Sequence, residues 1–143
     1  MLPVALKVLK SRKPDREPYR RFVAEVETLR KLGDLDGILP LLAAGLPKEP
    51  AVGDYPWLAM PVAEGIRAAL SKSPLDAVID AMAEVAETLA RLAAEHQIAH
   101  RDLKPANLYR DDGRALVGDF GLVSLPDADE LTREDRPLGP IHY

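Results

Sequence analysis

The sequence predicts an α+β protein with a small, β-rich first lobe that carries one helix and a mainly helical second lobe. Short β-rich runs come early in the chain, at residues 4–9, 38–44 and 57–62, whereas the longest amphipathic pattern comes later, at residues 73–93. Strands followed by helices are typical of α+β folds rather than of alternating parallel ones. We therefore expect two domains, at residues 1–63 and 64–143.

The first lobe is predicted to contain those three β-rich runs as strands, and the first run carries a single lysine, Lys7. Between the first and second runs, apolar residues recur at three- and four-residue spacing, which predicts a helix with one buried face. These residues are Phe22, Val26, Leu29 and Leu32. Gly33 and Gly37 follow the pattern and are expected to end the helix.

The second lobe is predicted to begin with the longest helix of the chain. Ser73 can cap its first turn, Pro74 suits the first helical position, and Asp76 completes a pattern similar to a capping box. A broad apolar stripe follows, formed by Leu75, Val78, Ile79, Met82, Val85, Ala86, Leu89, Leu92 and Ala93. A helix with such a stripe packs against a core on that side.

A hairpin is predicted further along, and its geometry brings two candidate metal ligands together. Residues 111–113, Asp-Asp-Gly, are a strong turn signal between two short β-rich runs. The strand pairing that this turn implies places Asn107 opposite Gly118 and Asp119. An amide oxygen and a carboxylate then meet at the open end of the hairpin, and such oxygen ligands suit a hard cation such as Mg²⁺.

A cluster of charged side chains lies just upstream, at His100, Arg101, Asp102 and Lys104. The region thus combines a carboxylate that can accept a proton, a cation that can contact a phosphate, and two metal ligands. This combination suits phosphoryl transfer, in which catalysis consists mainly of positioning and electrostatic stabilisation. Backbone capping is the ordinary interpretation of a single Asp or Asn in such a region, but it does not account for the whole group.

Three motifs, in order, resemble those of eukaryotic-type protein kinases. Residues 100–107, His-Arg-Asp-Leu-Lys-Pro-Ala-Asn, resemble the catalytic loop H-R-D-L-x-x-x-N, and residues 119–121 resemble the D-F-G element. Residues 4–7, Val-Ala-Leu-Lys, resemble the V-A-I-K strand. The resemblance covers essentially the whole chain, and the composition, rich in Ala, Leu and Arg, together with the compact loops, is similar to that of bacterial proteins. The resemblance implies a partial, protein-kinase-like two-lobed fold.

The helix of the first lobe offers two candidates, Glu25 and Glu27, for the glutamate that kinases pair with the strand lysine. Glu25 shares the apolar face, because it lies three residues after Phe22 and four before Leu29. Glu27 lies about 200° further around the helix and is expected to face solvent. A buried carboxylate requires a partner, so we predict that Glu25 pairs with Lys7.

The resemblance implies a role for each polar residue of the motifs. Asp102 would orient the hydroxyl of the substrate and accept its proton. Asn107 and Asp119 would hold Mg²⁺, and Lys7, in its ion pair, would contact the α- and β-phosphates of ATP. Lys104 is similar to the lysine with which Ser/Thr-specific kinases contact the transferred phosphate, so the implied partner is a protein substrate with a Ser or Thr acceptor.

The resemblance also implies an adenine pocket. Met60 would be the gatekeeper at the back of this pocket, although ordinary core packing is an alternative interpretation. Pro61 to Ala63 would form the hinge whose backbone groups bind the adenine edge.

Control by phosphorylation often accompanies an arginine before the catalytic aspartate in this family, and Arg101 occupies that position. Ser124 and Thr132 are the candidate acceptors, since a phosphate on either can pair with Arg101. Thr132 is the better candidate because it lies nearer the end of the loop, and ordinary polar loop residues are the alternative interpretation of both.

The resemblance stops short of a whole kinase domain. No G-x-G-x-x-G loop precedes Lys7, and residues 139–143 are similar to the segment just before the A-P-E element. Pro140 stands where many Ser/Thr kinases have a threonine that contacts the catalytic aspartate, and it has neither a hydroxyl nor an N–H. We therefore expect a chain that is incomplete at both ends and belongs to a longer product.

The composition is that of an ordinary globular protein. The 143 residues are 47% hydrophobic and 29% charged, with a net charge of −4 that argues against a nucleic-acid partner. No cysteine is present, which excludes disulfides, thiolate metal sites and thiol catalysis. No apolar run approaches the roughly 20 residues that a membrane span requires. We expect a cytoplasmic protein without a membrane segment.

The leading prediction is ATP- and Mg²⁺-dependent phosphoryl transfer to Ser or Thr of protein substrates. A nucleotide-binding pseudokinase or interaction module is the alternative, favoured by the missing glycine-rich loop and disfavoured by the intact catalytic residues. A small-molecule phosphotransferase of the same fold ranks last, because such enzymes usually show H-x-D-x-x-x-x-N without D-F-G.

Overall fold

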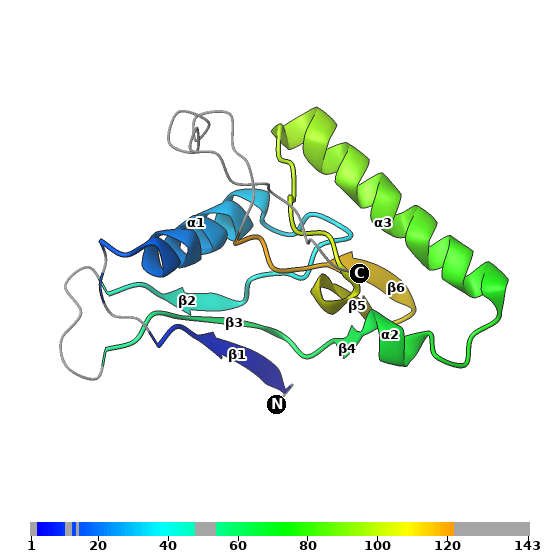
Figure 1. Cartoon of the computed structure of the whole chain (residues 1–143), viewed down its shortest axis with the longest axis horizontal. Coiled ribbons are helices and arrows are strands. Elements are labelled where there is room, and N and C mark those ends of the chain that lie inside the picture. The colour runs from blue at the N-terminus through cyan, green and yellow to red at the C-terminus, as the bar shows by residue number, and fades with distance from the viewer. Residues whose placement is uncertain (1–2, 11–12, 14, 48–53, 122–143) are drawn as a thin grey trace. The chain divides into compact units, whose positions relative to one another are not determined.

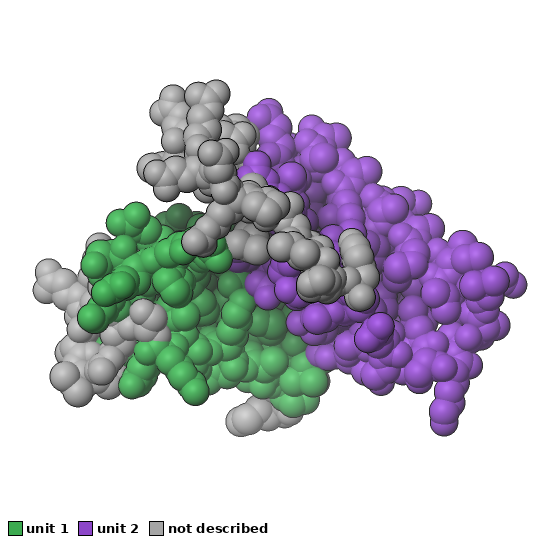
Figure 2. Space-filling view, viewed as in Figure 1, with its two compact units in different colours: residues 1–35, 39–62 green, residues 36–38, 63–143 purple. Residues whose placement is uncertain are grey.

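The computed structural model of the chain describes residues 3–10, 13, 15–47 and 54–121 (Figure 1). Contacts divide the chain into two compact units, one of Met1–Leu35 with Leu39–Val62 and one of Asp36–Ile38 with Ala63–Tyr143 (Figure 2). The kinase lobes expected at residues 1–63 and 64–143 stay a prediction. Ser124, Thr132 and Pro140 lie outside the described residues.

The first unit is a three-stranded antiparallel sheet with helix α1 (Glu17–Leu32) packed on one face (Figure 1). The strands follow the order β1-β3-β2, with bounds β1 (Val4–Val8), β2 (Ala43–Gly45) and β3 (Trp57–Pro61). Phe22 and Val26 of α1 form the core with Leu58 of β3. Because side chains alternate along a strand, Lys7 faces α1, whereas Leu6 and Val8 are exposed on the opposite face.

Helix α1 ends where the sequence predicts. Gly33 follows its last residue with a φ of 57°, a left-handed conformation that favours glycine, and its N–H donates to Leu29 O. The predicted apolar face is buried, since Phe22, Val26, Leu29 and Leu32 are each no more than 6% exposed.

The strand predicted over residues 38–44 is wrong in its bounds, because this run is divided between the two units. Ile38 forms an isolated parallel bridge with Val117 of the second unit. Pro40 has no N–H to donate to a ladder, and the strand β2 begins only at Ala43. The apolar character of the run therefore reflects burial in two places rather than one continuous strand.

The second unit contains a small antiparallel sheet in the order β4-β5-β6. Its elements are β4 (Glu64–Gly65), α2 (Ile66–Ala69), α3 (Leu75–His96), the short 3-10 helix η1 (Pro105–Asn107), β5 (Leu108–Asp111) and β6 (Arg114–Val117). The predicted hairpin is confirmed: β5 pairs with β6, and Arg110 lies opposite Ala115. Asp112 and Gly113 have φ values of 44° and 78°, as a two-residue turn that matches the strand twist requires.

The predicted start of helix α3 is wrong by one residue. Pro74 occupies the N-cap position without any side-chain cap, and the N–H of Ser73 donates to Leu70 O in the turn that follows α2. The predicted stripe is also divided in two. Val85 and Leu92 are buried together with Ala81 and Thr88, whereas Leu75, Ile79 and Met82 are 71%, 55% and 39% exposed.

Helix α3 is long, but its regular acidic residues keep its polarity high. In the part of the chain that the structure describes, no helix combines the length and the apolar character needed to cross a membrane.

Candidate active site

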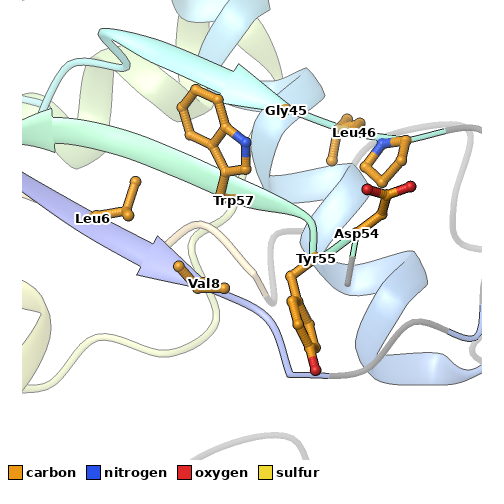
Figure 3. A pocket seen from close by; sticks show the side chains of 8 residues that line it. Leu6, Val8, Gly45, Leu46, Asp54, Tyr55 and Trp57 are labelled. Carbon is orange, nitrogen blue, oxygen red and sulfur yellow. The ribbon is translucent and has the colours of Figure 1, made fainter. Parts of the chain in front are cut away.

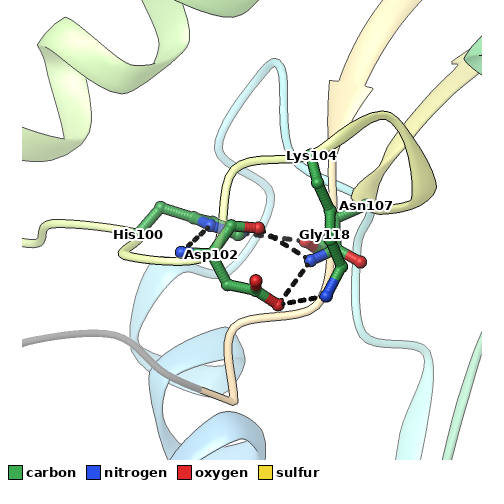
Figure 4. A network of polar contacts seen from close by, with 5 residues as sticks. All are labelled: His100, Asp102, Lys104, Asn107 and Gly118. Carbon is green, nitrogen blue, oxygen red and sulfur yellow. Dashed lines mark hydrogen bonds and ion pairs between the residues drawn. The ribbon is translucent and has the colours of Figure 1, made fainter. Parts of the chain in front are cut away.

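His100 anchors the loop that joins α3 to η1 in the second unit. It is 5% exposed, and its Nε2 lies 2.9 Å from Gly118 O while its Nδ1 accepts from the N–H of Asp102 at 3.3 Å (Figure 4). One ring nitrogen must donate and the other must accept, which is the pattern of a neutral imidazole protonated at Nε2. The ring of Phe120 packs edge-on against His100 at 5.1 Å. The histidine thus links Asp102 to the backbone beside Asp119.

The carboxylate of Asp102 is held on one side. Its Oδ2 accepts from Lys104 Nζ at 2.7 Å and from Asn107 Nδ2 at 3.0 Å (Figure 4). Among the described residues, the hydrogen bonds of this carboxylate all fall on Oδ2, so Oδ1 can accept a further hydrogen bond. The side chain of Asp102 is 16% exposed, so the carboxylate is fixed yet accessible.

Lys104 is a cation directed at the same carboxylate. The hydrogen bond to Asp102 is the largest influence and raises the pKa of Lys104 above its ordinary value of 10.5; burial opposes it, and the charges of Asp102 and Asp119 raise the pKa to a lesser extent. Lys104 is therefore protonated throughout the neutral range.

Asn107 lies beside Gly118, the residue before Asp119, as the hairpin geometry predicts. Gly118 N–H donates to Asn107 O at 2.9 Å, which fixes the residue before Asp119 beside Asn107. Asn107 is 4% exposed, and its Nδ2 donates to both Asp102 O and Asp102 Oδ2. Because both of these partners are acceptors, the amide orientation is determined. Within the described ranges no hydrogen bond occupies the amide oxygen Oδ1, so it can bind a ligand.

The donor set of Asn107 and Asp119 fits Mg²⁺. Within the described ranges there is no group of three or more His, Cys, Asp or Glu side chains that could hold a metal ion. A two-ligand oxygen site does not require one, because Mg²⁺ is usually held by one or two protein ligands together with waters and substrate phosphates. The amide oxygen of Asn107 and the carboxylate of Asp119 are ligands of that kind, and the hydrogen bond from Gly118 to Asn107 links the two segments that carry them.

The first unit contains an ion pair between Lys7 of β1 and Glu25 of α1. Lys7 Nζ donates to both oxygens of Glu25 at 2.8 Å, and Glu25 is 3% exposed while Lys7 is 40% exposed. Glu27 is exposed on the other side of the helix. The predicted choice of Glu25 over Glu27 as the partner of Lys7 is confirmed, and the nucleotide-binding role of the pair stays a prediction.

The predicted adenine-pocket residues lie at the end of the first unit and the start of the second. Met60 is opposite Ala5 of β1, and it is partly buried against the core of Phe22, Val26 and Leu58. Pro61 is the last residue of β3, and Ala63 begins the second unit. The packing of Met60 agrees with both of its interpretations, so the gatekeeper role stays a prediction.

A hollow of about 730 Å³ in the first unit is separate from this ion pair (Figure 3). Leu6, Val8 and Trp57 line it together with residues of the β2–β3 connection, among them Tyr55 and Asp54. These strand residues lie on the face of the sheet opposite Lys7, because side chains alternate along β1 and Val8 pairs directly with Trp57. The hollow is therefore no part of the candidate site.

Sequence reasoning missed the backbone partners of the site. Gly118 accepts from His100, and Gly37 accepts from the N–H of Val117. A glycine directly before Asp119 was the available signal for the first contact. No local pattern marks the second, because its two residues are far apart in the chain.

Comparison with known proteins places this arrangement among protein kinases, although no protein-family model matches the chain. The chain is 35% identical, over 98% of its length, to the DNA damage-responsive serine/threonine-protein kinase RqkA of Deinococcus radiodurans. It is 35% identical, over 99%, to the serine/threonine-protein kinase PknL of Mycobacterium tuberculosis. A tyrosine-protein kinase of Girardia tigrina is 34% identical over 94%. The chain spans 21%, 35% and 27% of the length of these relatives.

Proposed function

We propose that this chain, which is 35% identical to two Ser/Thr protein kinases over nearly its whole length, is part of such a kinase and contributes ATP- and Mg²⁺-dependent phosphoryl transfer to a Ser or Thr hydroxyl of a protein. The observation that carries the proposal is the state of Asp102, whose Oδ2 is held by Lys104 and Asn107. Because the chain spans about a third or less of the length of its relatives, the activity and substrates of the whole protein are part of the proposal.

Asp102 is the residue that orients the acceptor hydroxyl. With Oδ2 held in two hydrogen bonds, Oδ1 can accept a hydrogen bond from the hydroxyl and then its proton, which is the role of a general base. Lys104, beside this carboxylate, carries a positive charge that stabilises the negative charge of the phosphoryl group in the transition state.

Asn107 and Asp119 would hold Mg²⁺ through their amide and carboxylate oxygens. The ion, when bound, neutralises charge on the phosphates of ATP. The hydrogen bond between Gly118 and Asn107 keeps the two ligand residues in register before any ligand binds. Lys7, oriented by Glu25, would contact the α- and β-phosphates, and the backbone from Pro61 to Ala63 would bind the adenine next to Met60.

The Ser or Thr hydroxyl is proposed as the phosphate acceptor because of Lys104. Overall sequence identity does not decide this point, because one relative at similar identity is named as a tyrosine kinase. Small-molecule phosphotransferases are disfavoured because the relatives reported above are protein kinases. The reaction is expected to take place in the cytoplasm, where ATP is available.

The proposal is tested with matched peptides that differ only in a central Ser, Thr or Tyr, incubated with the chain and labelled ATP in Mg²⁺. Phosphate is expected on the Ser and Thr peptides and not on the Tyr peptide. Transfer to the Tyr peptide alone would contradict the assigned acceptor.

Calorimetric titration with Mg-ATP separates the kinase from the pseudokinase alternative. Asp119→Ala is expected to weaken Mg-ATP binding, whereas Asp112→Asn, an exposed change at the turn of the same hairpin, is expected to bind like the wild type. Binding without phosphoryl transfer would support a nucleotide-binding pseudokinase. The absence of both Mg-ATP binding and phosphoryl transfer would contradict the proposal.

A further inference from the structure

The outer edge of β6 has unusual partners. One edge of this strand pairs with β5, and the N–H groups of the other edge are bound by a helix and a loop. Ala115 N–H donates to Oε2 of Glu84 in α3 at 2.7 Å, and Val117 N–H donates to Gly37 O at 2.8 Å. Since β6 leads directly to Gly118 and Asp119, these contacts bear on the position of a proposed metal ligand.

Gly37 can approach α3 only because it lacks a side chain. Its φ is +90°, and a Cβ at this position would lie 2.0 Å from Thr88 Oγ1 and 3.0 Å from Thr88 Cγ2. Thr88 is 2% exposed, and its hydroxyl donates to Glu84 O at 3.0 Å. The threonine therefore cannot turn away without losing that hydrogen bond inside a packed interface.

The residues on both sides of Gly37 contact the rest of the second unit. Arg91 of α3 donates to Asp36 O, and Arg114 of β6 forms an ion pair with Asp36 Oδ1 at 3.3 Å. Ile38 forms the parallel bridge with Val117. Residues 36–38 thus form a short segment that contacts both α3 and β6.

A continuous series of contacts leads from Gly37 to the proposed metal ligands. Gly37 binds Val117, and the next residue, Gly118, donates to Asn107 O and lies within hydrogen-bond distance of His100 through its own carbonyl. Asp119 follows at once. A shift of Gly37 away from α3 therefore moves the backbone that carries Asp119 relative to Asn107.

We infer that Gly37, packed on Thr88 and supported by Glu84, is a positioning residue for the Asn107–Asp119 pair. The inference rests on the proposed function, because it assumes that this pair binds Mg²⁺ with ATP. On this inference Gly37, although distant in sequence, determines the separation of the two proposed metal ligands. Mutation of residues that orient ligands typically weakens metal affinity by about 10- to 100-fold.

The test is calorimetric titration of the 143-residue chain with ATP, once in Mg²⁺ and once in EDTA. Gly37→Ala is expected to weaken Mg-ATP binding by about 10- to 100-fold and to leave metal-free ATP binding unchanged. Glu84→Ala, which removes the contact with β6, is expected to act in the same direction, whereas Glu84→Gln retains an acceptor oxygen and binds like the wild type. Glu87→Ala, exposed on the same helix, is the matched control.

Two double variants separate positioning from general destabilisation. When Asp119 is already replaced by Ala, adding Gly37→Ala is expected to have no further effect, because both changes act on the same ligand. Thr88→Ala removes the Oγ1 and Cγ2 atoms that a new Cβ would meet. Adding Thr88→Ala to Gly37→Ala is therefore expected to restore part of the Mg-ATP affinity.

Equal Mg-ATP binding by the wild type, Gly37→Ala and Glu84→Ala would overturn the inference and leave the proposed function intact. Equal losses in Mg²⁺ and in EDTA would also overturn it, since they indicate general destabilisation. If Gly37→Ala fails to fold, the test rests on the Mg-ATP affinities of Glu84→Ala and Glu84→Gln, and equal affinities of these two variants would overturn the inference. A wild-type chain that binds no Mg-ATP would overturn the proposed function and the inference together.

Discussion

The ion pair of the first unit and the polar network of the second are built in different ways. Lys7 and Glu25 are 18 residues apart, and they meet only because α1 packs on the sheet. Asp102 lies two residues from Lys104 and five from Asn107, so a single loop brings them together. The first contact therefore depends on packing between segments distant in sequence, whereas the second depends on local backbone geometry. Different substitutions should therefore break each of them.

The largest expected effect comes from the acceptor oxygen of the local network. Asp102→Asn removes the proton acceptor and is expected to lower kcat by about 10²- to 10⁴-fold, measured with a Ser peptide. Mg-ATP affinity is expected to change little, because Asn107 and Asp119 are retained. A variant with wild-type kcat would show that Asp102 does not act as the base.

Loss of the ion pair in the first unit is expected to lower the stability of the fold. Glu25→Ala removes the partner of Lys7 and leaves a gap beside the core, and we expect the free energy of unfolding to fall by about 2 kcal/mol. The measurement is denaturant unfolding followed by circular dichroism.

Glu27→Ala is the matched control on the same helix, because Glu27 is exposed and surface substitutions usually stay within about 0.5 kcal/mol. Equal losses of stability in the two variants would mean that the Lys7–Glu25 pair contributes nothing specific.

The turn of the hairpin tests how far local geometry supports the network. Gly113 has a φ of 78°, and a Cβ there would meet no atom within 4 Å. Gly113→Ala is therefore expected to destabilise only through its backbone conformation, by about 1 kcal/mol, as measured by the midpoint of urea unfolding. Increased stability of this variant would contradict the described turn.

The smallest expected effect concerns the protonation of Lys104. Its pKa is raised above 10.5 by the hydrogen bond to Asp102. A raised folded-state pKa means that the stabilisation by this contact is fully present below the unfolded pKa and is lost as pH rises through the folded pKa. We expect no change in this contact between neutral pH and the ordinary lysine pKa.

NMR titration of the Lys104 side chain provides the measurement. The Asp102→Asn variant is expected to lower the pKa of Lys104 relative to the wild type. A lysine that titrates below 10.5 in the wild type would exclude the hydrogen bond as the dominant influence.

Much of the site was predictable where neighbours in sequence are neighbours in space. The register of β5 and β6 followed from the turn at Asp112 and Gly113, and it correctly placed Asn107 beside Gly118. Helical periodicity was sufficient to select Glu25 over Glu27. By contrast, the strand predicted at residues 38–44 was wrong, because hydrophobicity reports burial and does not say which unit provides it.

The chemical groups of the candidate site and their local geometry follow from the sequence, because turn residues and helical spacing restrict the backbone over a few positions. The support of the edge of β6 depends instead on tertiary packing. Glu84 reaches Ala115 across 31 positions, and Gly37 meets Thr88 only because α3 passes beside it. Such contacts are set by the packing of a helix against a strand, and packing between distant segments leaves no periodic signal in the chain.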